Sequence, residues 1–234
     1  MEETRFQGFS SHMSRGETAA VLLWLPIHVL LLPTLLLMLF PGLSDADLNF
    51  WVYAVGALLM VLLCLRFLRR DFDTLCDRTG FVVFQVMFSY GLMLLGNLVV
   101  VQLLSMVLPP ENPNNTAAVD LALESEGKIF AATALLAPIL EELMFRAGIF
   151  GLLRRRSRAL AYAVCVLLFG IYHVWQYALS DPLSWLYALQ YVPIGILLCR
   201  CYEKTETIWT SIFLHMTVNS ISLWMLTLAR ELMS

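Results

Sequence analysis

Residues 81–108 read FVVFQVMFSYGLMLLGNLVVVQLLSMVL and contain no charged side chain. This block is longer than the roughly 20 residues that a helix needs to cross about 30 Å of hydrocarbon. Apolar blocks of similar length recur along the chain, so a single anchor or a signal peptide does not account for them. Of the 234 residues, 59% are hydrophobic and 14% are charged, against about 45–50% and about 25% in soluble domains. The sequence therefore predicts an all-α, polytopic transmembrane helical bundle.

We expect a single integral membrane domain, residues 1–234, because no internal repeat or low-complexity linker divides the chain. The polar stretch 109–127 is its longest loop, and we expect it to be solvated. About seven spans are predicted, with a possible eighth half-span within the long third segment. The spans lie near residues 18–41, 48–68, 80–108, 128–153, 158–178, 183–200 and 207–230.

Basic residues alternate between the two sides of the predicted spans. The loops 42–47, 109–127 and 179–182 contain no arginine, and Lys128 stands only at the edge of the fourth span. Cytoplasmic loops of membrane proteins carry the excess of lysine and arginine. We therefore predict an integral protein of the plasma membrane with a cytoplasmic amino terminus and an external carboxy terminus. The basic residues assigned to the cytoplasmic side are Arg5, Arg15, Arg66, Arg69, Arg70, Arg78, Arg154, Arg155, Arg156, Arg158, Arg200 and Lys204.

The charge and the cysteine pattern exclude several classes of protein. The net charge is −3 and no basic patch is present, which argues against a nucleic-acid partner. No CxxC pair occurs, so the cysteines are expected to be small apolar core residues and not a disulfide framework or a zinc knuckle. They are Cys64, Cys76, Cys165, Cys199 and Cys201.

The fourth span carries three charged side chains, Glu141, Glu142 and Arg146. Charged groups inside a membrane helix cost a few kcal/mol, so they usually face partners and serve a function. Glu142 and Arg146 stand four residues apart in the favourable order for a helical ion pair. Glu141 lies about 100° round the helix with no partner in its own span. Pro138 removes a backbone donor one turn earlier and is expected to free the carbonyl of Ala134 and kink the helix.

Three polar side chains of later spans fall at the depth of Glu141. His173 lies in the fifth span, and His215 and Asn219 lie one turn apart on one face of the seventh. With a rise of 1.5 Å per residue, all four side chains lie roughly 13–22 Å from the cytoplasmic ends of their helices. We therefore predict a polar site near the middle of the membrane.

Other polar or aromatic side chains in the spans are expected to be structural. His28 in the first span has no partner at a depth that the sequence reveals. Tyr172, Trp175 and Tyr177 fit an outer interfacial belt of aromatic residues.

These motifs resemble the CPBP family (CAAX protease and bacteriocin-processing, also called Abi), which includes CAAX prenyl endopeptidases and bacteriocin-processing or self-immunity proteins. The family pattern is EExxxR, then FxxxH, then HxxxN. Here it stands as Glu141-Glu142…Arg146, Phe169…His173 and His215…Asn219. The resemblance covers about residues 128–230, which would carry the catalytic core.

The resemblance implies an intramembrane endopeptidase that acts on a peptide or protein within the lipid bilayer. Glu141 and His173 would activate a water molecule, while His215 and Asn219 would stabilise the oxyanion. Peptide hydrolysis needs a base and preorganised donors of this kind. Glu142 and Arg146 would support the site, with Arg146 orienting Glu142.

Three alternatives stay open at this point. Glu141, His173 and His215 also form a two-histidine, one-carboxylate set of the kind that binds zinc. The absence of HExxH and the presence of Asn219, which is a better hydrogen-bond donor than zinc ligand, favour a site without metal or other cofactor. The same residues would also serve a non-catalytic immunity factor or scaffold. A small transporter is disfavoured because no repeat relates the two halves of the chain.

Overall fold

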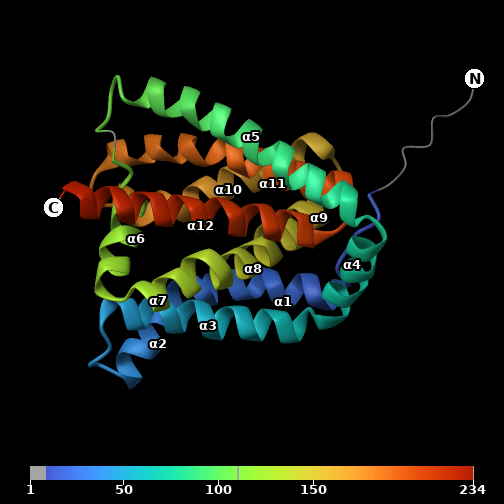
Figure 1. Cartoon of the computed structure of the whole chain (residues 1–234). Helices are drawn as coiled ribbons and strands as arrows, with labels where there is room; N and C mark the ends of the chain where they lie inside the picture. The colour runs from blue at the N-terminus through green and yellow to red at the C-terminus, as the bar shows by residue number, and fades with distance from the viewer. Residues whose placement is uncertain (1–8, 110, 234) are drawn as a thin grey trace, which may run out of the picture.

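The computed structural model describes residues 9–109 and 111–233, and all regular secondary structure within these ranges is helical (Figure 1). The prediction of an all-α polytopic bundle is confirmed. Within the described residues, six helical segments are long and apolar enough to cross a membrane, so the chain is an integral membrane protein. They are Arg15–Leu39, Asp45–Leu63, Thr79–Leu104, Arg158–Ala178, Pro182–Thr205 and Ile208–Leu232.

The first span is one bent helix. It consists of α1 (Arg15–Pro26), a π-helical turn η1 (Ile27–Leu31) and α2 (Leu32–Leu39). Pro26 and Pro33 flank the π-helical turn and lack a backbone N–H, which explains the wider turns between them. The bend places α2 at the lower edge of Figure 1, where it packs against α3.

The predicted second span ends earlier than expected. α3 (Asp45–Leu63) stops at Cys64, and α4 (Leu65–Asp77) is a separate helix at one end of the bundle. Asp71 of α4 is buried and accepts hydrogen bonds from Ser11 Oγ and from the backbone N–H of Ile208, both at 2.8 Å. Burial raises the pKa of this carboxyl. The arginine-rich segment after α3 is therefore a docked helix and not a loop.

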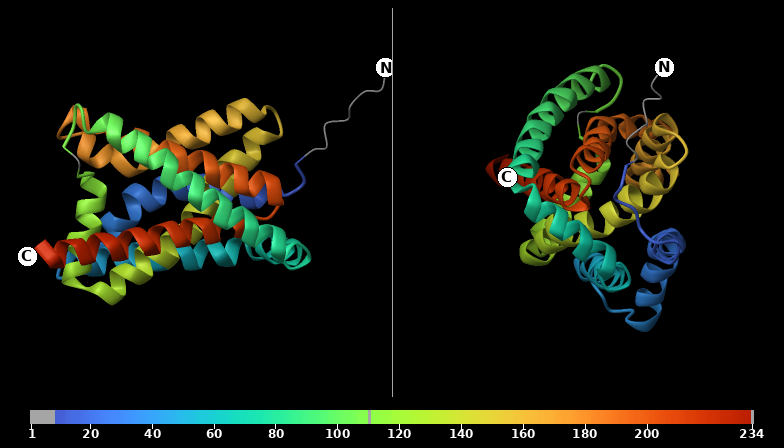
Figure 2. Two further views of the ribbon diagram at one scale, coloured as in Figure 1. Left: turned by 45° about the horizontal axis from the view of Figure 1, so that its top comes forward. Right: turned by 90° about the vertical axis from the view of Figure 1, so that its right-hand side faces the viewer.

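The third span, α5 (Thr79–Leu104), is one uninterrupted helix. The eighth half-span that we considered within this segment is therefore not present among its residues. The expected loop 109–127 is also different, because it contains α6 (Pro113–Glu124). α6 packs against α3, α10 and α12, and its Val119 and Ala122 are buried. The left view of Figure 2 shows α6 crossing the end of the bundle. The expectation of a solvated loop is wrong for these residues.

Residues 126–154 form one winding helix at the centre of the bundle. Its composition excludes it from the six apolar segments, because Glu141, Glu142 and Arg146 lie within it. Every residue from Glu142 to Phe150 is buried. The surrounding helices therefore enclose the charged side chains. The parts are α7 (Glu126–Phe130), the π-helical η2 (Ala131–Leu136), α8 (Ala137–Glu141), the π-helical η3 (Glu142–Phe150) and α9 (Gly151–Arg154).

The last three spans complete the wall around this helix. α10 (Arg158–Ala178) packs against η4, a 3₁₀ helix (Pro182–Gln190) that leads into α11 (Tyr191–Thr205). A Cβ on Gly170 would lie 3.1 Å from the carbonyl oxygen of Ala188, so glycine permits this close approach. α12 (Ile208–Met233) runs the length of the bundle.

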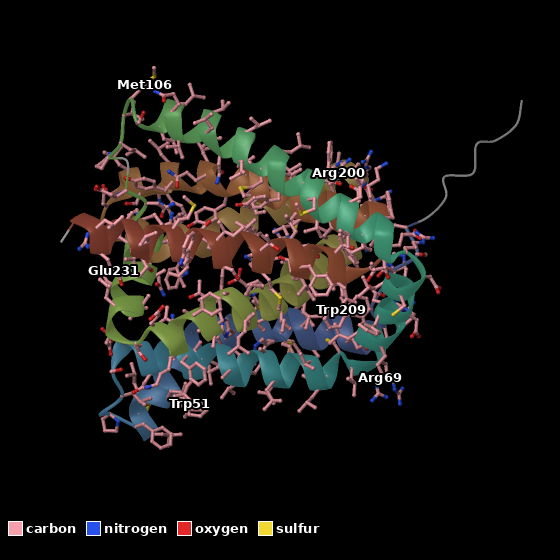
Figure 3. The ribbon with its side chains drawn as sticks, viewed as in Figure 1. Trp51, Arg69, Met106, Arg200, Trp209 and Glu231 are labelled. Atoms are coloured by element: carbon pink, nitrogen blue, oxygen red, sulfur yellow. The ribbon has the colours of Figure 1, made fainter. Side chains whose placement is uncertain are left out.

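The two ends of the bundle differ in charge. α1 begins at the end where α4 lies, and α12 ends beside α6 (Figure 1). Arg69 and Arg200 lie toward the α4 end, and Glu231 lies at the opposite end (Figure 3). The beginning of α1 and the end of α12 therefore lie at opposite ends of the bundle, while the number of crossings, predicted as about seven, stays a prediction. Arg5, which we assigned to the basic side, lies outside the described residues.

Candidate active site

Glu142 and Arg146 form the ion pair that their spacing predicts. Arg146 Nη1 donates to Glu142 Oε1 at 3.0 Å, and both side chains are completely buried. The guanidinium carbon lies 4.0 Å from the ring centroid of Phe169. A cation over an aromatic face is stabilised most where water is excluded. Phe169, the first residue of FxxxH, therefore supports the charge of the first motif.

His215 connects the two neighbouring glutamates. Its Nδ1 lies 2.8 Å from Glu142 Oε1, and its Nε2 lies 3.8 Å from Glu141 Oε2. The ion-paired carboxylate of Glu142 can only accept a hydrogen bond, so Nδ1 of His215 carries the hydrogen of this contact. In the neutral ring, Nε2 then directs its lone pair toward Glu141. Sequence reasoning paired Glu142 with Arg146 alone and missed this bond to His215.

His173 approaches Glu141 from the other side. Its Nδ1 lies 2.8 Å from the carbonyl oxygen of Phe169, four residues earlier in α10. A carbonyl only accepts, so Nδ1 again carries the hydrogen. Nε2 lies 3.7 Å from Glu141 Oε2, and the ring stacks on Tyr191 with 4.3 Å between centroids. The hydrogen bond to Phe169 therefore holds the edge of the imidazole, and the stacking on Tyr191 holds its face.

Asn219 is held by the central helix. Its Nδ2 donates to the carbonyl oxygen of Thr133 at 2.9 Å, which leaves the second amide hydrogen available. Thr133 belongs to the π-helical turns that precede Pro138. We expected Pro138 to free the carbonyl of Ala134. The carbonyl that accepts from another helix is instead that of Thr133.

A cavity of about 670 Å³ leads to this cluster. Glu141, His173 and Asn219 all line it. Glu141 is only 3% exposed, and its Oε2 accepts no hydrogen bond from any described residue. A buried, unpaired carboxylate oxygen at the inner end of a cavity is placed to bind a proton-donating group such as water.

Three side chains that we expected to be structural or interfacial also line the cavity. His28, Tyr172 and Tyr177 face it and do not form an outer aromatic belt. Tyr172 Oη lies 3.3 Å from His28 Nε2 and 3.4 Å from Tyr53 Oη. No sequence pattern indicates this contact, because the depth of His28 depends on the bend after Pro26.

Glu141, His173 and His215 are the residues that would hold a zinc ion. Each imidazole gives its Nδ1 hydrogen to an oxygen, which is also how metal-bound histidines are oriented. The donor types therefore suit zinc. As they stand, the described residues include no group of three His, Cys, Asp or Glu side chains that could hold a metal ion.

Comparison with known proteins bears on the same segment. Residues 126–221 match the family model described as "Type II CAAX prenyl endopeptidase Rce1-like". The resemblance to the CPBP family is therefore confirmed. The segment matched to this family of membrane peptidases begins with α7 and ends two residues after Asn219, so it includes all three motifs.

A curated relative supports the assignment. The chain is 28% identical over 111 residues to "Putative membrane peptidase YdiL" of Bacillus subtilis (strain 168). This alignment covers 47% of the chain and 41% of the relative's length. No solved structure matches the chain significantly.

Proposed function

We propose that this protein is an intramembrane endopeptidase of the CAAX-protease type. One observation carries the proposal. Glu141 Oε2 lies buried, without a hydrogen-bond partner, between Nε2 of His173 and Nε2 of His215 at the inner end of a cavity. A carboxylate flanked by two imidazole nitrogens suits the proton transfers of peptide hydrolysis.

Glu141 and His173 activate the water in this mechanism. Glu141 accepts a proton as the water oxygen bonds to the scissile carbonyl carbon. His173 Nε2, whose lone pair faces Glu141, relays that proton to the leaving nitrogen as the C–N bond breaks. The carboxylate is regenerated, and the two products carry the atoms of the added water. No other group needs to gain or lose a proton.

His215 and Asn219 stabilise the oxyanion that forms on the carbonyl. Asn219 donates its second amide hydrogen, because the first is held by Thr133. His215 donates only when Nε2 is protonated, since its Nδ1 hydrogen is committed to Glu142. Arg146 holds Glu142 in place through their ion pair and so acts by positioning.

A zinc-dependent version of the peptidase is the second candidate. The observation that favours it is the commitment of both Nδ1 hydrogens to oxygen acceptors, as in metal-bound histidines. Glu141, His173 and His215 would hold the ion, which would supply Lewis-acid chemistry.

The proposal is tested by comparing peptides of cells that express the wild type or Glu141→Gln. We expect Glu141→Gln to accumulate and fold normally while specific cleavage products disappear, because glutamine keeps the shape but is not a base. Glu124→Gln is the matched control, since Glu124 is exposed in α6 and does not line the cavity. Unchanged cleavage products in Glu141→Gln would refute the assignment, and no products in any strain would favour an immunity factor or scaffold.

A further inference from the structure

The cavity extends from Glu141 toward one end of the bundle only. Apart from the residues beside Glu141, most of its lining comes from the first turns of α3, from α6, from the later turns of α10 and from the part of α12 between Asn219 and Leu226. Exposed residues among them mark its mouth. They are Asp45, Asn115, Asp120, Gln176, Ser222 and Leu226.

The opposite side of Glu141 is filled with side chains. Every residue of η3 is buried, and the rings of Phe145 and Phe150 are among the largest fully buried side chains. Phe9 and Tyr202 pack with Phe150 toward the α4 end, at centroid distances of 6.0 and 6.2 Å. A peptide therefore has no open path to Glu141 from the arginine-rich end.

The lining of the mouth is polar and acidic. Asp45 and Asp120 line it, and neither lysine nor arginine does. Asp45 forms no ion pair with any described residue, whereas the carboxylate of Asp120 lies 3.8 Å from exposed Arg230. A cleft lined by one sign of charge concentrates ligands of the opposite sign. The side-chain amides of Asn49 and Gln176 add hydrogen-bonding groups that suit a peptide backbone.

We propose that substrates enter from the α6 end and that Asp45 and Asp120 select peptide segments carrying lysine or arginine. This inference rests on the proposed function, because Glu141 at the inner end of the cavity is the group that such a peptide would reach.

A thiol at the mouth tests the direction of entry. Ser222→Cys introduces it on α12, and the native Cys76 in α4 is exposed and reports on the other end. The full-length protein is labelled in cells and in inverted membrane vesicles with membrane-impermeant methanethiosulfonates. We expect the introduced thiol and Cys76 to react from opposite sides. Reaction of both from one side, or reaction of the introduced thiol only with membrane-permeant reagents, would overturn the inference.

The charge preference is measured on the same thiol. We compare the labelling rates of a trimethylammonium reagent and a sulfonate reagent, each divided by its rate with free cysteine. We expect about a tenfold preference for the cationic reagent at low ionic strength. Combining Asp45→Asn with Asp120→Asn should reduce it to within about twofold. Glu124→Gln is the control, because it removes a carboxylate of α6 that does not line the cavity.

Protection by peptides completes the test. Dodecapeptides of alternating alanine and lysine, or alanine and glutamate, are added before the sulfonate reagent. The lysine peptide should slow labelling several-fold and the glutamate peptide should not. Equal protection by both, or by neither, would contradict the proposed selectivity. These measurements need no turnover, so their failure is distinguishable from failure of the peptidase proposal, which depends on Glu141→Gln.

Discussion

Replacing Arg146 with methionine removes one charge from a completely buried ion pair. Methionine keeps much of the length and volume of the side chain, so the charge is the main change. Glu142 then loses the donor 3.0 Å from its Oε1 and keeps only His215. Phe169 also loses the cation over its face.

The expected cost follows from that burial. Removing one partner of a buried ion pair typically destabilises a protein by about 3–5 kcal/mol, because the other charge stays desolvated. For a chain of this size each kcal/mol lowers the melting temperature by roughly 2–4 °C. Thermal unfolding of the detergent-solubilised protein should therefore move down by roughly 6–20 °C. Arg158→Met is the matched control and should cost at most about 1 kcal/mol, because Arg158 is 59% exposed in its pair with Glu203.

A double variant separates stability from activity. Glu142→Gln together with Arg146→Met removes both charges of this ion pair, so neither is left without its partner and most of the lost melting temperature should return. Cleavage should not return, because His215 has then lost the carboxylate that orients its Nδ1. If Arg146→Met melts within 2 °C of the control, by the same conversion of roughly 2–4 °C per kcal/mol, the buried ion pair does not contribute as argued.

Four further outcomes are expected. Asn219→Ala should lower the cleavage rate about 10²- to 10³-fold, the usual loss for one oxyanion donor; a smaller effect would leave Asn219 only its bond to the central helix. Elemental analysis of purified wild type and His215→Ala should find no stoichiometric metal in either, and one zinc per chain that is lost in His215→Ala would establish the zinc version. Thiols introduced at 112–116 and at 155–157 should react from opposite sides of the membrane, and reaction from one side would refute the topology. Gly170→Val should lower the melting temperature by several degrees, measured in detergent, because its side chain would collide with the carbonyl of Ala188; an unchanged value would show that η4 can move.

The fold was predictable where hydrophobic length decides it. The charge-free block at 81–108 forms the single long helix α5. α6 was missed because its polar, proline-containing sequence resembles a solvated loop. The helix packs on surfaces of α3, α10 and α12 that come together only when the bundle folds. α4 was missed because its arginines alternate with apolar residues that pack against α12, a contact that no local pattern reveals.

The site was predictable as a set of residues but not as a set of bonds. The spacing of Glu142 and Arg146 indicates their ion pair, since both lie on one helix. The contact between Glu142 and His215 depends on how the central helix is rotated against α12, and the π-helical turns of η2 and η3 set that rotation. No sequence pattern reliably predicts π-helical turns, so the contact of Glu142 with His215 could be found only from the structure.

The two glutamates are not interchangeable, although they are consecutive in the sequence. Glu142 is buried against a cation and one nitrogen of His215, so its charge is already used to orient that ring. Glu141 faces the other nitrogen, has no cation within hydrogen-bonding distance, and borders the cavity. Only Glu141 therefore has both an unused oxygen and a route for substrate. The imidazole of His215 lies between the two carboxylates, and Glu142, itself paired with Arg146, holds its Nδ1. In the proposed mechanism, a proton that Glu141 accepts would therefore change the charge beside a ring whose position is already fixed.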